Sequence, residues 1–184
     1  MALALLLGTA LATAGLAVVS LQGFLVPHDL AGASLEARTL VTRHISWAIP
    51  TVIFSLFSQS MVIFFFIGTG KLIREEVAAF PDPERVRVLA ALRRFKRQTS
   101  PPATFALLSS IAVFVLGGAA HTRALPAAVH LMSALAALGL HLWALAAEWR
   151  AFGENARLMS DPKAYARQQP TADGPRGPAR STVA

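Results

Sequence analysis

The sequence predicts an all-α integral membrane protein, a four-transmembrane-helix antiparallel bundle with both termini in the cytoplasm. Four long runs without Asp, Glu, Lys or Arg give the number of helices: residues 2–27, 45–70, 98–122 and 124–147. Each run exceeds the roughly 20 apolar residues that cross a bilayer as a helix. Only 15% of the 184 residues are charged, against about 25% in a soluble domain, so the composition points the same way.

The distribution of basic residues predicts the orientation of the bundle. Eight Lys and Arg lie in residues 71–97 and six follow Glu148, whereas the two opposite connections hold three. Cytoplasmic loops carry the excess of Lys and Arg in membrane proteins, so both termini and the basic loop are expected on that side. The predicted location is the inner (cytoplasmic) membrane, with several passes.

These two patterns define the expected organisation of the chain. We expect one membrane domain, 1–159, with spans at about 3–26, 46–70, 102–120 and 126–148, a basic cytoplasmic loop, 71–101, and a disordered cytoplasmic tail, 160–184. The first run lacks the basic start of a signal peptide and is too long for one, which favours an uncleaved helix. The tight turn at 121–126 predicts a hairpin of the third and fourth helices.

Local signals predict where the helices begin and end. Ser34 is a predicted N-cap for a helix that leads into the second span, and Pro50 should kink that span or mark its start. The glycines of Gly68-Thr69-Gly70 should end it. Asp82 is a predicted N-cap for a short basic cytoplasmic helix between spans two and three, ending near Gln98.

That short helix is predicted to contact the membrane surface. Its basic residues are Arg85, Arg87, Arg93, Arg94, Lys96 and Arg97. Such a helix can lie on an anionic inner leaflet, and ordinary positive flanking charge explains the same pattern equally well. Nucleic acid is not an expected partner, because the aromatic residues that interleave with basic ones on such surfaces are absent.

One face of the second helix is polar. At about 100° per residue, Thr51, Ser55 and Ser58 fall in line with His44, and Gln59 flanks this stripe. A polar face in lipid must point at protein or water, so these residues should face the bundle interior. His141 on the fourth helix lies at a similar depth, and Gln59 is its expected hydrogen-bond partner. No Asp or Glu is expected inside a span to extend a proton relay.

Histidines form the one convergent group. His28, His44, His121 and His130 each lie at the periplasmic end of a predicted helix, so they could serve as metal ligands. Candidate cofactors are haem b, copper and zinc, with His44, His121 and His130 the stronger ligands; the alternative is that these residues are interfacial and bind nothing. The arrangement resembles small cytochrome b subunits at the level of architecture.

Three functional classes remain in competition. The absence of a catalytic motif favours a non-catalytic accessory or scaffold subunit of a membrane complex, whose partners are other membrane subunits or a second copy. The alternative is a metal- or haem-binding redox membrane protein that uses the periplasmic histidines. A transporter is disfavoured because the expected spans lack charged residues. The balance is therefore against an enzyme.

Overall fold

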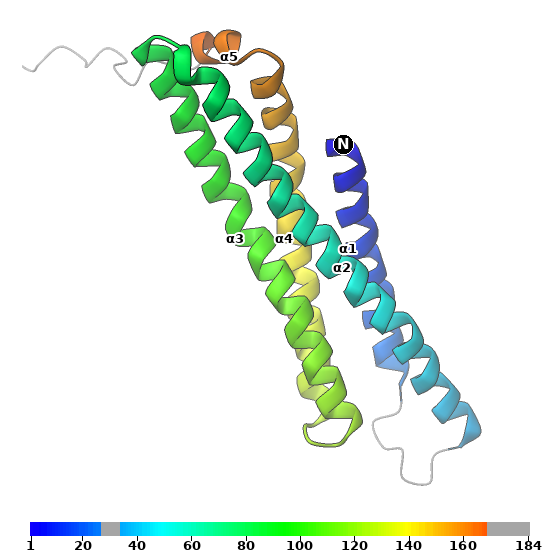
Figure 1. Cartoon of the computed structure of the whole chain (residues 1–184). Coiled ribbons are helices and arrows are strands. Elements are labelled where there is room, and N and C mark those ends of the chain that lie inside the picture. The colour runs from blue at the N-terminus through cyan, green and yellow to red at the C-terminus, as the bar shows by residue number, and fades with distance from the viewer. Residues whose placement is uncertain (27–33, 169–184) are drawn as a thin grey trace, which may run out of the picture.

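The computed structural model describes residues 1–26 and 34–168, and within these ranges the chain is helical without strands (Figure 1). Its elements are α1 (Ala2–Leu25), α2 (Leu35–Glu76), η1 (Val77–Ala79), α3 (Asp82–His121), α4 (Ala127–Ser160) and α5 (Pro162–Gln168). The helices α1 to α4 are long and apolar enough to cross a membrane. This confirms the predicted all-α class with four long apolar helices.

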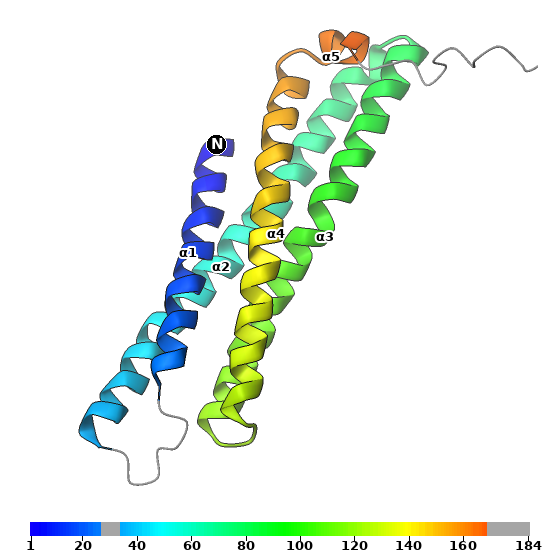
Figure 2. The same ribbon diagram turned by 180° about the vertical axis from the view of Figure 1, so that it is seen from behind.

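The four long helices form one bundle. Both α1 and α3 pack against α2 and α4, so α1 lies diagonally opposite α3, and α2 lies diagonally opposite α4. The turn between α3 and α4 lies at one end of the molecule, called the turn end below, and α5 lies at the other, the head end (Figures 1 and 2). Side chains of α2 and α4 therefore meet across the centre of the bundle.

Regular spacing of small and polar residues brings α4 against its neighbours. The buried positions of α4 repeat every seven residues in two series. One series is Ala137, Ala144, Ala151 and Leu158, and the other, four positions later, is His141, Glu148 and Asn155. Such spacing is typical of left-handed helix bundles, and small side chains let membrane helices approach closely. The centre of the bundle is consequently polar.

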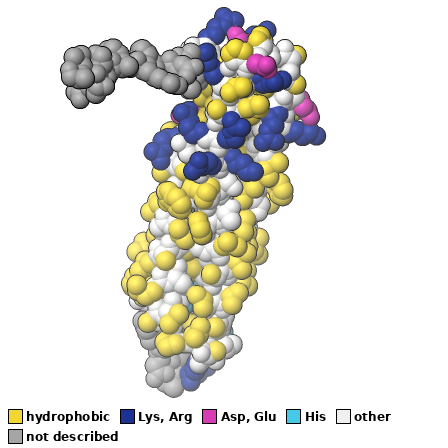
Figure 3. All heavy atoms as spheres, turned by 90° about the vertical axis from the view of Figure 1, so that its left-hand side faces the viewer, with side chains coloured by type: hydrophobic (Ala, Val, Ile, Leu, Met, Phe, Trp, Pro, Cys, Tyr) yellow, Lys and Arg dark blue, Asp and Glu magenta, His cyan; other side chains and the backbone are white. Residues whose placement is uncertain are grey.

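Beyond the apolar part of the bundle, α2, α3 and α4 continue into a basic head, which is defined as residues 71–98 and 149–168. Its core contains nine buried side chains: Ile73, Val77, Val88, Ala91, Leu92, Phe95, Leu158, Tyr165 and Ala166. The head holds twelve Lys and Arg against six Asp and Glu. In Figure 3 the basic side chains gather around this end, and hydrophobic side chains cover the length below it.

The structure corrects the expected course of α2. The Ser34 N-cap is confirmed, since its hydroxyl accepts a hydrogen bond from the Ala37 N–H at 3.3 Å. However, α2 runs without interruption through Pro50 and past Gly70 to Glu76. A glycine costs a helix only about 1 kcal/mol, and the packing of Ile73 into the head core offsets that cost.

The basic segment after α2 is not the separate short helix that the sequence predicted. It is the first part of α3, which continues through Pro101 and Pro102 to His121. The N-cap is Pro81, and Asp82 is the first helical residue. Prolines weaken a helix interior, but α3 is held on both sides of this pair, by the head core and by the bundle. The segment therefore continues the bundle instead of lying across its end.

The first part of the predicted tail is helical in the structure, contrary to the expectation. Residues 162–168 form α5, and Tyr165 and Ala166 are buried in the head core. Two apolar residues within a polar segment are too few to raise its hydropathy over the length of a membrane helix. The composition of the tail therefore did not indicate that they are buried. The remainder of the predicted tail, 169–184, lies outside the described residues.

Candidate functional site in the bundle core

Eight polar side chains that face the interior of the bundle, all buried except the half-buried His44 and His130, lie in three layers along it. From the turn end they are the histidine-pair layer (His44, His130), the serine–histidine layer (Ser55, Ser110, His141) and the glutamate layer (Thr9, Gln59, Glu148). Eleven positions of α4 separate its first two layers, and seven separate its last two, or about 16 Å and 10 Å along the helix. Each layer includes residues of both α2 and α4.

The serine–histidine layer is a closed hydrogen-bond network. His141 Nε2 lies 2.8 Å from Ser55 Oγ and 3.2 Å from Ser110 Oγ, and the two hydroxyls are 3.1 Å apart. All three residues are fully buried. The other ring nitrogen, Nδ1, lies 2.8 Å from the Ala137 carbonyl one turn back on α4. The network links α2, α3 and α4.

The direction of these hydrogen bonds follows from the Ala137 contact. A carbonyl only accepts, so the Nδ1–H donates to it, and Nε2 of the neutral ring is an acceptor. The Ser55 hydroxyl, which has the shorter contact, then donates to Nε2. The Ser110 hydroxyl has a second acceptor, the Ala106 carbonyl at 3.2 Å. This leaves Ser110 as a reserve donor to the imidazole.

The glutamate layer differs because the polar atoms of Glu148 and Gln59 are not paired. Glu148 and Gln59 are fully buried, and Glu148 lies against Gln59 and the Thr9 hydroxyl. Nevertheless, no carboxyl oxygen of Glu148 and no amide atom of Gln59 has a hydrogen-bond partner among the residues that the structure describes. The Thr9 hydroxyl donates to the Leu6 carbonyl at 3.1 Å. Its oxygen is thus left as an acceptor.

Apolar side chains close the core on the head side of the glutamate layer. Leu6, Val62 and Phe152 lie three or four residues closer to the head than Thr9, Gln59 and Glu148, and they form one buried cluster. Phe66 stacks on Phe152 with ring centroids 5.1 Å apart. This apolar plug separates the polar layers from the basic head.

The histidine-pair layer brings together two of the predicted ligands. The rings of His44 on α2 and His130 on α4 have centroids 6.4 Å apart. Both Nδ1 atoms are buried and have no hydrogen-bond partner in the described part of the chain. Each ring also lies against a glycine: a Cβ added at Gly23 would be 3.6 Å from His44, and one at Gly117 would be 2.9 Å from His130. Gly117 therefore makes room for the His130 ring, whereas a Cβ at Gly23 would only be in ordinary contact with His44.

The other two predicted ligands do not join this pair in the structure. His121 is exposed at the last position of α3, and His28 lies outside the described residues. The described residues contain no group of three or more His, Cys, Asp or Glu that could hold a metal ion. A site in this layer would therefore rest on His44 and His130 as its protein ligands.

The polar face of α2 lies inside the bundle, but Gln59 does not have the hydrogen-bond partner that the sequence predicts. Ser55, Ser58 and Gln59 are buried, while Thr51 is half-buried and donates to the Trp47 carbonyl at 2.7 Å. The expected pairing of Gln59 with His141 is wrong, because the two serines occupy the imidazole.

No Asp or Glu is expected inside a span, and Glu148 is expected at the boundary of the last one. In the structure the Glu148 side chain is fully buried in the bundle. A signal was present in the sequence: positions 130, 141 and 148 share one face of α4, at offsets of about 20° and 0°. That shared face placed Glu148 with the interior histidines.

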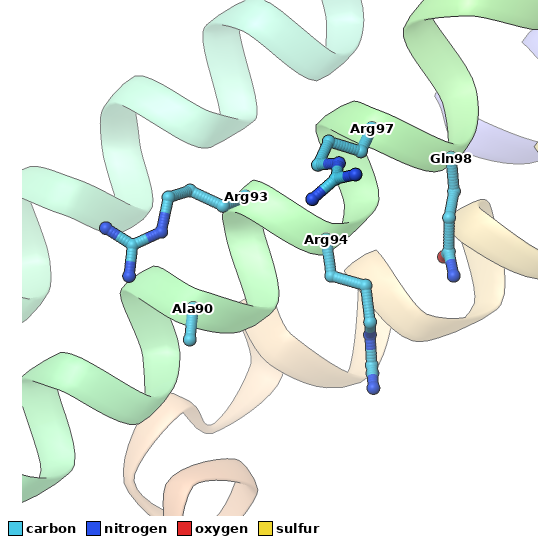
Figure 4. Close-up of a pocket in the computed structure, with 5 residues that line it drawn as sticks. All are labelled: Ala90, Arg93, Arg94, Arg97 and Gln98. Carbon is cyan, nitrogen blue, oxygen red and sulfur yellow. The ribbon is translucent and has the colours of Figure 1, made fainter.

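The predicted basic residues lie along the head part of α3. Arg85 pairs with Asp82, Arg87 donates to the Ala166 carbonyl at 3.3 Å, and Arg94 lies 3.5 Å from Glu154. Arg93, Lys96 and Arg97 are exposed. A surface hollow of about 570 Å³ is lined by Ala90, Arg93, Arg94, Arg97 and Gln98 (Figure 4). An anionic group would meet several donors there.

Comparisons with protein-family models, with curated proteins and with solved structures found no match for this chain.

Proposed function

We propose that this chain is a multi-pass protein of the inner membrane that serves as a non-catalytic accessory or scaffold subunit of a membrane complex. The observation that supports this most is the basic head. It is a folded platform with its own apolar core, carried on a bundle whose outer surface is hydrophobic. Such a chain is suited to hold a basic surface at a fixed height above the bilayer.

The head is proposed to lie in the cytoplasm, together with both termini. The excess of Lys and Arg at this end supports that orientation through the positive-inside rule. The Arg93, Arg94, Arg97 and Gln98 hollow lies just before the apolar part of α3, at the height where lipid headgroups are expected. Anionic lipids of the inner leaflet are the proposed contact for this surface.

The orientation can be tested by cysteine labelling without background reaction of the chain itself, because the chain contains no cysteine. We would introduce Thr122→Cys in the α3–α4 turn or Ala78→Cys in the head, both at exposed positions. In spheroplasts, a membrane-impermeant maleimide should label the Thr122 variant, and the Ala78 variant should react only after lysis. The reverse pattern would contradict the proposed topology.

The subunit role is tested by the state of the protein in gently solubilised native membranes. Native mass spectrometry should find the chain in a defined assembly with other membrane subunits or with a second copy. Arg93→Gln/Arg97→Gln should lower the amount of assembly or of co-purifying anionic lipid, while Lys163→Gln/Arg167→Gln, at two exposed positions of α5, serves as a charge-matched control. A monomer that retains neither would contradict the role.

A second candidate function is a metal- or haem-binding redox protein. The facing rings of His44 and His130, each with a buried and unpaired Nδ1, favour it. Imidazole nitrogens are common ligands of haem iron, copper and zinc. The residues present fit such a group in chemistry, since they supply neutral nitrogen donors from two helices across the bundle centre. When bound, the group would supply electron transfer or a structural link between α2 and α4.

Absorption spectra and metal analysis test this candidate. The protein purified in mild detergent should show a Soret band that shifts on reduction, or near-stoichiometric copper or zinc. Replacing His44 and His130 with alanine should abolish the signal, whereas His121→Ala should leave it unchanged because that residue is exposed. A colourless and metal-free wild type would rule the candidate out.

A further inference from the structure

We propose that the glutamate layer is a binding site for a small monovalent metal cation, Na⁺, with ligands from Glu148, Gln59 and Thr9. The site is separate from the histidine pair and independent of the proposed subunit role. It lies between α1, α2 and α4, on the turn-end side of the apolar plug.

The need for a positive charge follows from the burial of Glu148. The residue is fully buried, and an isolated ionised carboxylate in such surroundings is strongly disfavoured. No Lys or Arg lies in residues 2–25 of α1, 45–70 of α2 or 98–121 of α3. The nearest basic residue on α4, Arg150, is exposed and donates to the Ala146 carbonyl at 3.2 Å. Within the part of the chain that the structure describes, these helices therefore supply no partner charge.

The atoms around the carboxylate are mostly acceptors. Glu148 contributes two oxygens and Gln59 contributes its amide oxygen, all without hydrogen-bond partners in the described structure. The Thr9 hydroxyl proton is directed at the Leu6 carbonyl, so the Thr9 oxygen has free lone pairs. Carboxylate, amide and hydroxyl oxygens are the ligands that hard metal cations select. Three helices thus provide four oxygens of this kind.

A proton on Glu148 is the competing explanation, and the infrared measurement below distinguishes it from the metal ion. A protonated carboxyl would pair directly with the neighbouring amide, donating its proton and accepting an N–H. In the structure the Gln59 amide and the Thr9 hydroxyl lie close to the Glu148 carboxyl, but no hydrogen bond of ordinary geometry is completed between them. Fully buried carboxyl oxygens without a hydrogen-bond partner in the described structure are groups that a bound metal ion would satisfy. His141, the nearest histidine on the turn-end side, is engaged by Ser55 and Ser110.

The test measures Na⁺ binding directly. Purified protein in lipid nanodiscs would be equilibrated with radioactive Na⁺ at constant ionic strength, with choline replacing sodium. We expect near-stoichiometric binding by the wild type and its loss in Glu148→Gln. Glu154→Gln, an exposed glutamate nearby on the same helix, is the matched control and should bind as the wild type does.

Two further variants address the ligands, in case Glu148→Gln does not fold. Thr9→Val removes one oxygen at nearly constant volume and should weaken Na⁺ binding about tenfold or more, and Thr9→Ser should restore it. In parallel, infrared spectra of the wild type should lose any protonated-carboxyl band of Glu148 as sodium replaces choline. Absence of Na⁺ binding, or a Glu148 carboxyl that stays protonated at high Na⁺, would overturn the proposal.

Discussion

Replacing both Ser55 and Ser110 with alanine should destabilise the protein by more than the sum of the two single replacements. Each hydroxyl lies within hydrogen-bonding distance of His141 Nε2, at 2.8 Å and 3.2 Å. Removing Ser55 lets Ser110 turn its proton from the Ala106 carbonyl to the imidazole. Removing Ser110 leaves the shorter Ser55 contact in place. One donor therefore remains in either single variant.

The expected magnitudes follow from this redundancy. A side-chain hydrogen bond between membrane helices contributes about 0.6 kcal/mol on average, so each single variant should lose roughly that amount. The double variant leaves a fully buried nitrogen without a donor, which costs about 1–3 kcal/mol. The coupling between the two positions should thus approach ~1 kcal/mol, or about a fivefold change in the unfolding equilibrium.

Reversible unfolding in mixed micelles of increasing SDS content, followed by circular dichroism, measures these free energies. Ser109→Ala is the control, because the Ser109 hydroxyl bonds only to Ala106 within its own helix, at 2.8 Å. It should cost little. Strictly additive losses for Ser55 and Ser110, or a Ser109 loss equal to either, would refute the donor assignment around His141.

The remaining predictions concern packing and surface charge, and the same unfolding assay measures all three. Gly117→Ala should cost about 1–3 kcal/mol, because its Cβ would be 2.9 Å from His130 Cε1; Gly118→Ala, which meets open space, should not be destabilising. Leu158→Ala should cost about 2–5 kcal/mol, because Leu158 is fully buried in the head core, and a smaller loss would mean that the head contributes little stability. Arg94→Gln should change stability by no more than ~1 kcal/mol, since its ion pair is exposed, and a larger loss would contradict a surface role.

The apolar helices were predictable because membrane insertion depends on a property summed along the chain. Runs without charge are long and unambiguous, and they give the number of long helices directly. Helix ends were less predictable. Gly70 and Pro101 are poor helix residues, but packing of the neighbouring head residues carries both helices through them, and packing is not visible in a local pattern.

The sequence predicts which face of α2 lies in the core, but it does not predict which residues of α2 and α4 contact each other. The helical wheel places Ser55 and Gln59 near one side of α2, yet it does not say what lies opposite them. That depends on the vertical offset between α2 and α4, which the loops do not determine. The sequence therefore predicts Gln59 as the partner of His141, whereas in the structure Gln59 lies against Glu148. An offset of one or two helical turns exchanges these partners.

The seven-residue repeat of α4 has a consequence for how the helices find their alignment. Ala137, Ala144 and Ala151 are identical, so the small-residue series would fit its neighbours almost as well if α4 slid by one repeat, about 10 Å. Steric fit alone therefore discriminates poorly between the native alignment of α4 and one shifted by seven residues. The second series is not repetitive: His141, Glu148 and Asn155 each require different partners. In this bundle the polar residues therefore specify the axial position of α4 relative to its neighbours, because only one alignment gives each of them its own partners.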